Sequence, residues 1–194
     1  FMLNLKLATD PRWVNLAEKN ISEILTDHAY CEQKAATSCI SLIIMYPDLK
    51  PIVEALIPIV SEEWSHFGMV MDEIYKRNFK LGFPRKDEYV NKLKKFQKKE
   101  GSREDILVEK LLTNALIEAR SCERFRLLSI ELDDEYLRKF YHSFMTSEAG
   151  HYKLFMDLAR IYKDNDYVKE RWSQYLNHEV EIFNTIELRG DRMH

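Results

Sequence analysis

Residues 61–67 read SEEWSHF and contain Glu63 and His66 in an E-x-x-H pattern. The same pattern recurs in residues 147–152, which read SEAGHY. Positions i and i+3 of a helix lie on one face, so each pair can bind one metal ion. Both pairs lie in stretches whose apolar residues have helical spacing, where an inward-facing Glu and His would be costly without a partner. We therefore interpret both pairs as metal ligands rather than as surface ion pairs.

The turns predicted near these motifs indicate further acidic ligands. Two residues of an antiparallel helix pair lie at equal height when they are equidistant from the turn that joins the helices. The midpoint in sequence between Glu32 and Glu63 falls at Pro47 and Asp48, where a turn is predicted. Glu32 is therefore expected to face the first E-x-x-H pair.

The second pair, Glu148 and His151, has two candidate partners on the preceding helix. Glu118 and Glu148 are centred on Asp133, in the next predicted turn, whereas the midpoint between Glu123 and Glu148 lies inside the following helix. Both candidates lie on apolar stripes. The spacing favours Glu118, and Glu123 stays open as the alternative.

The pattern along the chain predicts a bundle of long helices. Helices are expected at residues 22–46, 51–80, 103–131 and 135–163, with a short helix from Asp10 and a last helix at 167–188. The gap between Glu63 and Glu118 is too long for a hairpin and holds a basic amphipathic segment, 85–101. We predict an all-α, ferritin-like four-helix bundle with a long crossover and additional flanking helices. A single domain over residues 1–194 is expected.

Composition supports this fold and excludes several other classes. The 194 residues include only 5 Gly and 5 Pro, too few turn formers for a β-sandwich or barrel, and no Gly-rich phosphate loop occurs. A net charge of −3 excludes an overall basic surface for nucleic acid but not a local one. The longest uncharged run is too short to span a bilayer and no secretory leader is recognised, so we expect a cytoplasmic protein that does not enter the membrane. Phe1, which precedes Met2, is interpreted as an added residue.

The donor set indicates which metal the site would bind. The candidate ligands are Glu32, Glu63, His66, Glu118, Glu148 and His151. Carboxylates and imidazoles together suit two hard-to-borderline ions such as iron or manganese, and the lack of thiolates argues against structural zinc. The three cysteines, Cys31, Cys39 and Cys122, form no C-x-x-C and are expected to be small residues in or near the core.

Four stretches resemble the tRNA-(2-methylthio-N-isopentenyl-adenosine) hydroxylases, the MiaE family. They are DHAYCEQKAA (27–36), SEEWSHF (61–67), ALIEARSCERF (115–125) and SEAGHY (147–152), and the resemblance extends over roughly residues 10–165. It implies a ferritin-like, non-haem di-iron monooxygenase that hydroxylates the isopentenyl group of a modified adenosine beside the tRNA anticodon. The same six residues would be the ligands of two iron ions. Gly150 departs from the family, which tends to have a larger residue between the Glu and the His.

The resemblance also implies cofactors and partners. Dioxygen would be a co-substrate, and electrons would come from an external donor such as a reductase or a ferredoxin. A tRNA partner needs phosphate contacts, for which the candidates are Lys92, Lys94, Lys95, Lys98 and Lys99, with Arg120, Arg124 and Arg126 as further candidates. A solvated helix face is the alternative interpretation of the lysines. Tyr30, Phe67, Phe125 and Tyr152 either line an apolar mouth for the prenyl tail or belong to the bundle core.

Two other functions remain open at this stage. One is iron storage or ferroxidase activity of the ferritin type, which needs a shell-forming oligomer. The other is a di-metal oxidase that acts on a small molecule or a fatty acid, which would leave the lysine segment without a role. We expect a monomer or a dimer.

Overall fold

The computed structural model describes residues 2–194, and the secondary-structure elements of these residues are all helices, with no strand. Phe1 lies outside the described residues. A short 3-10 helix, Met2–Asn4, and helix α1, Arg12–Glu18, precede the long helices. The predicted all-α class is confirmed.

The chain divides into two compact units. The first, here the α2–α3 unit, consists of Asn15–Lys86 and Arg189–Met193. The second, the α5–α6 unit, consists of the described residues up to Val14, Asp87–Leu188 and His194. The expected single domain stays a prediction.

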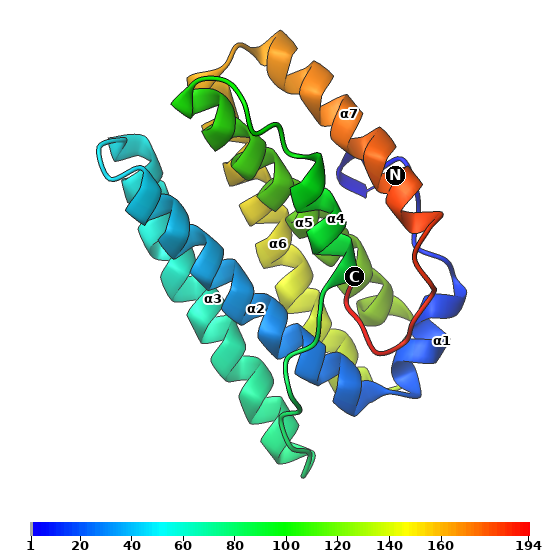
Figure 1. The fold of residues 1–194 in the computed structure, drawn as a ribbon. Helices are drawn as coiled ribbons and strands as arrows, with labels where there is room; N and C mark the ends of the chain where they lie inside the picture. Colours follow the sequence, from blue (N-terminus) through cyan, green and yellow to red (C-terminus); the bar gives the residue numbers. More distant parts are fainter. Residues whose placement is uncertain (1) are drawn as a thin grey trace. The chain divides into compact units, whose positions relative to one another are not determined.

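A hairpin of two antiparallel helices forms most of the α2–α3 unit (Figure 1). Helix α2 covers Ile21–Met45 and α3 covers Lys50–Lys76, with Pro51 in the first turn of α3. Pro is favoured there because its missing N–H would have no partner within the helix. Leu42, Ile52 and Leu56 are among the buried apolar residues near the turn.

The second long helix ends earlier than predicted. We expected it to continue to Lys80, but α3 ends at Lys76. Asn78 has a φ of 59°, in the left-handed region that ends a helix, and its N–H donates to the carbonyl of Tyr75. The break therefore comes from the backbone of Asn78 rather than from Gly82 and Pro84, which follow in an extended segment.

A second antiparallel hairpin forms the centre of the α5–α6 unit (Figure 1). Helix α5 covers Arg103–Glu131 and begins with a reciprocal capping box between Ser102 and Asp105. Helix α6 covers Glu135–Tyr162, and the Asp134 side chain caps it by accepting from the N–H of Leu137.

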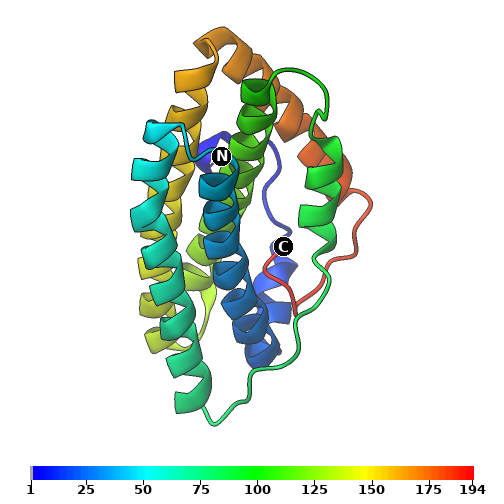
Figure 2. The same cartoon turned by 60° about the vertical axis from the view of Figure 1, so that its left-hand side comes forward.

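Two further helices of the same unit lie side by side, α4 at Glu88–Phe96 and α7 at Asn165–Phe183 (Figure 2). Asp87 caps α4 and Asp164 caps α7 through their carboxylates. The last helix ends at Phe183 instead of at residue 188. A turn follows it, in which the N–H and the hydroxyl of Thr185 both donate to the carbonyl of Ile182.

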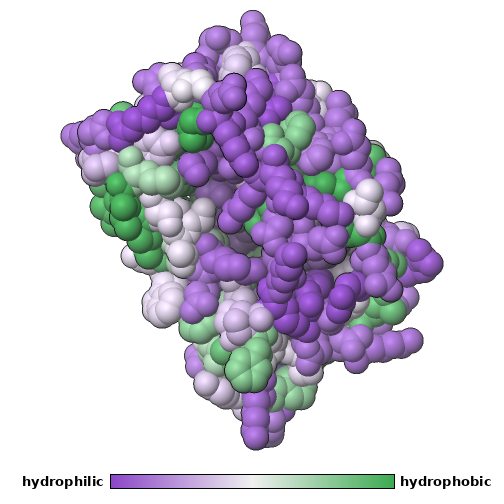
Figure 3. Space-filling model, viewed as in Figure 1, coloured by the Kyte–Doolittle hydropathy of each residue, from purple (hydrophilic) through white to green (hydrophobic). Residues whose placement is uncertain are grey.

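The surface seen in Figure 3 is mostly hydrophilic, with hydrophobic side chains in separate areas. None of the helices among residues 2–194 combines the length and the apolar character that crossing a bilayer would require.

Candidate metal centre

Three buried side chains from α2 and α3 form a cluster that we call the α2–α3 half-site: Glu32, Glu63 and His66. Each offers a donor atom, and these atoms lie within 4.8 Å of one another. The Nδ1 atom of His66 lies 3.4 Å from Oε2 of Glu32 and 3.7 Å from Oε2 of Glu63. The hairpin thus brings Glu32 to the first E-x-x-H pair, as the turn spacing predicts.

The α5–α6 half-site has the same composition, with Glu118, Glu148 and His151. Their donor atoms also lie within 4.8 Å of one another, and Nδ1 of His151 is 3.9 Å from Oε2 of Glu118. All three side chains are buried. Each hairpin therefore buries two carboxylates and one imidazole in a single cluster.

Glu123, the alternative to Glu118, lies in a different environment. Its carboxylate accepts from the backbone N–H of Thr9 at 2.9 Å, from the Thr9 hydroxyl, and from Arg120 at 2.7 Å. These donors use both of its oxygens in a buried ionic network of the α5–α6 unit. This geometry supports Glu118 as the ligand from α5.

Sequence reasoning missed His28 as a functional residue. It is fully buried, and its Nε2 lies 2.7 Å from Oε1 of Glu32, one helical turn away on α2. A histidine at i−4 from a candidate ligand was the available signal, because residues i and i+4 are neighbours on a helix. His28 therefore holds one oxygen of Glu32 in place.

The close carboxylates change the protonation of the α2–α3 half-site. Burial lowers the pKa of His66, but hydrogen bonds and charge interactions with Glu32 and Glu63 outweigh it and raise that pKa to about 9. Burial raises the pKa of Glu32, yet the bonds from His28 and His66 outweigh this and hold it well below its usual range. A proton on His66 thus compensates charge that a metal ion would otherwise compensate.

The donor set fits iron or manganese in both half-sites. Carboxylate and imidazole donors suit such ions, and neither cluster includes a thiolate. Cys122 is buried and its S–H donates to the carbonyl of Met145 at 3.2 Å. Burial raises the pKa of this thiol to about 12, which keeps it protonated near neutral pH.

The model of the family described as tRNA-(MS[2]IO[6]A)-hydroxylase (MiaE) matches residues 2–194 of the chain. The chain belongs to the MiaE family. The resemblance noted in the sequence is thereby confirmed and extends over the whole described chain.

Two similar proteins of the MiaE family bear the name tRNA 2-(methylsulfanyl)-N(6)-isopentenyladenosine(37) hydroxylase. The protein from Pseudomonas putida strain KT2440 is 34% identical over 157 residues, with 80% of this chain and 75% of that protein covered. The protein from Salmonella typhimurium strain LT2 is 27% identical over 206 aligned positions, with the same coverage of 80% and 75%.

A solved structure is also similar to this MiaE family member. It is described as protein 43 with aldehyde deformylating oxygenase activity from Synechococcus. The TM-score is 0.92 at 31% identity, and the match covers 98% of this chain and 94% of the other. This ferritin-like neighbour supports the predicted architecture.

The candidate tRNA contacts differ in exposure. Lys94, Lys95, Lys98 and Lys99 are exposed, whereas Lys92 is half-buried and bonds to Glu88 at 3.0 Å and Thr185 at 2.9 Å. The lysine segment, residues 92–99, therefore has an accessible basic face.

Two of the three arginine candidates are not available for RNA. Arg120 is fully buried and pairs with Glu179 at 2.9 Å, and Arg124 is buried over the ring of Trp13, 4.6 Å from its centroid. The expectation that they contact tRNA was wrong, because a side chain enclosed by the core cannot reach a phosphate. Arg126 is exposed.

The aromatic candidates divide between core and surface. Phe125 is buried and stacks on Tyr141 with ring centroids 5.6 Å apart, so it belongs to the hydrophobic core. Phe67, Tyr30 and Tyr152 are half-buried. Phe67 stacks on Trp64 at 5.1 Å, and the Tyr30 hydroxyl donates to the carbonyl of Gly82 at 2.9 Å.

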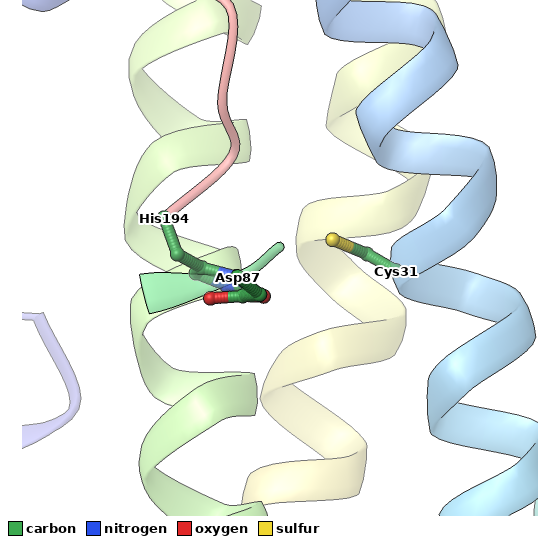
Figure 4. A group of neighbouring side chains, drawn as sticks. All are labelled: Cys31, Asp87 and His194. Atoms are coloured by element: carbon green, nitrogen blue, oxygen red, sulfur yellow. The ribbon is translucent and has the colours of Figure 1, made fainter. Parts of the chain in front are cut away.

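His194 and Asp87 lie close together in the α5–α6 unit, and Figure 4 shows their side chains. Nδ1 of His194 is 3.7 Å from Oδ2 of Asp87, and Nε2 is 3.0 Å from the hydroxyl of Ser121. The ring stacks on Tyr89 at 5.2 Å. These contacts give His194 a structural role beside the first turn of α4.

Proposed function

We propose that this protein hydroxylates the isopentenyl group of a modified adenosine next to the tRNA anticodon, as a di-iron, dioxygen-dependent monooxygenase. The family match over residues 2–194 carries the proposal. The names of the two similar proteins support the substrate, and the two buried clusters of carboxylates and one imidazole each support the metal. A cytoplasmic location would suit this role.

The proposed iron ligands are Glu32, Glu63, His66, Glu118, Glu148 and His151. When bound, a pair of ferrous ions would supply the activation of dioxygen that insertion of oxygen into a C–H bond of the isopentenyl group requires. The remaining electrons come from an external donor, a reductase or a ferredoxin. The chain itself provides buried carboxylates, and His28 holds Glu32 in place.

Substrate recognition is assigned to exposed lysines. tRNA binding by a chain of net charge −3 must depend on a local basic face, and Lys94, Lys95, Lys98 and Lys99 provide one. Lys92 is held by Glu88 and Thr185, so we give it a smaller part.

The function is tested by nucleoside analysis of bulk tRNA. Cells that lack the protein should accumulate the unhydroxylated isopentenyl nucleoside, and cells that express it should contain the hydroxylated form. Purified iron-loaded protein with a reductant should perform the same conversion on tRNA from the deficient cells. Unchanged nucleosides in both experiments would contradict the proposed reaction.

A second candidate follows from the solved structure that resembles this chain. The Synechococcus protein is described as having aldehyde deformylating oxygenase activity. An oxygenase acting on a small apolar aldehyde would need the iron ligands but not the lysine segment. Formate release from an apolar aldehyde, without any conversion of tRNA, would favour this candidate.

A further inference from the structure

A buried ionic cluster outside both half-sites lies at the end of α4. Its centre is Glu109 on α5, which accepts two bonds from Arg171 of α7, at 2.6 and 2.8 Å. The same carboxylate accepts from the Tyr175 hydroxyl at 2.8 Å and from the backbone N–H of Lys98 at 3.0 Å. Glu118 follows Glu109 by nine positions, about 13.5 Å along a helix, so this cluster is not part of the metal centre.

The cluster holds the chain where α4 ends. Arg171 also donates to the carbonyl of Phe96 at 3.1 Å, and its guanidinium lies over the Phe96 ring, 4.4 Å from the centroid. The side chain of Gln97 donates to the hydroxyl of Thr113 at 2.7 Å. Three successive residues, 96–98, are thereby tied to α5 and α7.

The other end of α4 is held in a similar way. The Tyr89 hydroxyl donates to Glu179 at 2.7 Å, and Glu179 pairs with Arg120. Tyr89 and Leu93, four residues apart, are buried on one face of α4. With both ends held and this face buried, Lys94 and Lys95, the exposed lysines of α4, point away from that face.

A buried ion pair of this kind adds little to stability compared with apolar residues of the same size, because desolvation offsets its attraction. Such pairs instead select one arrangement of the backbone, as some buried polar groups do in other folds. Here the pair fixes the backbone of residues 96–98, and Lys99 follows directly. An ordered lysine segment loses less conformational freedom when it meets phosphates.

We propose that Glu109 and Arg171 are a positioning pair that presents Lys94, Lys95, Lys98 and Lys99 to the phosphates of an RNA substrate. This inference rests on the proposed function, since it assumes that tRNA is the partner. Neither residue of the pair contacts RNA. They act through the backbone of Phe96 and Lys98.

Glu109→Gln separates positioning from simple electrostatics. Removing a negative charge makes the chain less acidic, so electrostatics alone predicts tighter tRNA binding. Loss of positioning predicts the opposite, a dissociation constant roughly threefold to tenfold higher, because the backbone of the lysine segment must then be ordered on binding. Glu100→Gln, at an exposed position beside the same lysines, is the matched control and should bind tRNA equally well or slightly more tightly.

A second variant is needed because Glu109→Gln leaves the Arg171 charge unpaired in the core and could destabilise the fold. Glu109→Leu combined with Arg171→Met keeps the net charge and removes the buried pair together. It should melt near the temperature of the unmodified protein and bind the same amount of iron. Its tRNA affinity should nevertheless fall, and the salt dependence of log K should flatten by roughly 0.7–0.9 for each phosphate that the lysines no longer neutralise.

The outcomes distinguish this inference from the proposed function. If the unmodified protein binds tRNA and both variants bind it as tightly or more tightly, the positioning role is wrong while the tRNA function stands. If the unmodified protein does not bind tRNA at low salt, the proposed function fails first. Weaker binding in both variants, with normal iron content and unchanged affinity in Glu100→Gln, supports the positioning pair.

Discussion

His28 and Glu32 lie one turn apart on α2, with Nε2 of His28 2.7 Å from Oε1 of Glu32, and both side chains are buried. The other oxygen of Glu32 faces Nδ1 of His66 at 3.4 Å. One carboxylate is therefore held from two sides, by a residue of its own helix and by a candidate ligand on α3. This arrangement makes His28 part of the candidate centre although it is not among the proposed ligands.

Replacement of His28 by Ala should weaken iron binding. Loss of a residue that orients a ligand typically costs 10–100-fold in metal affinity, and we expect a decrease of about this size. Anaerobic titration with Fe(II) measures it. His142, an exposed histidine of α6, provides the control, and His142→Ala should bind iron normally. Equal affinity in the two variants would show that His28 does not support the site.

The two glutamates of α5 should differ in their response to substitution. Glu118→Ala should reduce bound iron, as should Glu63→Ala and His151→Ala. Glu123→Ala should keep its iron but lose about 1–3 kcal/mol of stability, because the Thr9 N–H and Arg120 each lose a buried acceptor while Arg120 keeps Glu179. Iron analysis combined with denaturant unfolding checks both effects. Loss of iron in Glu123→Ala, with none in Glu118→Ala, would reverse the assignment.

Stability of the metal-free protein should depend on the proton held by His66. The folded pKa of about 9 lies above the ordinary value of 6.5, so His66 stabilises the fold fully below about pH 6.5. This contribution, roughly 1–3 kcal/mol after allowance for partial exposure, is lost as pH rises through about 9. Denaturant unfolding with chelator at pH 6.5 and pH 9.5 measures the difference, and His66→Gln should reduce it.

Metal binding should stabilise the protein. Ions that bind only the folded state add stability by mass action, about 2.7 kcal/mol at a free concentration of 100 times the dissociation constant. The iron-loaded protein should therefore melt at a higher temperature than the chelated protein near neutral pH. Binding should also weaken toward acidic pH, because the ion must displace the proton of His66. An equal melting temperature for the iron-loaded and the chelated protein would contradict a buried metal centre.

Charge reversal of the lysine segment should affect tRNA binding alone. Lys94, Lys95 and Lys98 are exposed, so changing all three to Glu should weaken binding and reduce its salt dependence. Iron content should not change, since the proposed ligands lie on other helices. Full tRNA affinity in this variant would move the binding face elsewhere, with Arg126 as the next candidate.

Two glycines should respond to alanine in opposite directions. A Cβ at Gly190 would lie 2.4 Å from the backbone of Leu16, so Gly190→Ala should destabilise the protein by about 1–3 kcal/mol. A Cβ at Gly150, inside α6, would meet nothing within 4 Å. Gly150→Ala should therefore stabilise by up to about 1 kcal/mol through helix propensity. Thermal unfolding of the two variants, side by side, tests both signs.

Local sequence patterns were enough to predict the helical class, both E-x-x-H pairs and most of the helix bounds. These features depend on the spacing of apolar residues, the caps at Ser102 and Asp134, and the i, i+3 relation within one helix. The equal-height argument reached Glu32 because a short turn fixes the register of an antiparallel hairpin.

Side chains whose partners lie far away in the chain could be placed only from the packing of the helices in three dimensions. Glu123 is held by Thr9, 114 residues earlier, and Arg120 by Glu179, 59 residues later. No local spacing predicts such pairs, because burial depends on which helices pack together. The same reason explains why Arg120 and Arg124 were expected at the surface, and why the buried pair of Glu109 and Arg171 could not be seen in the sequence.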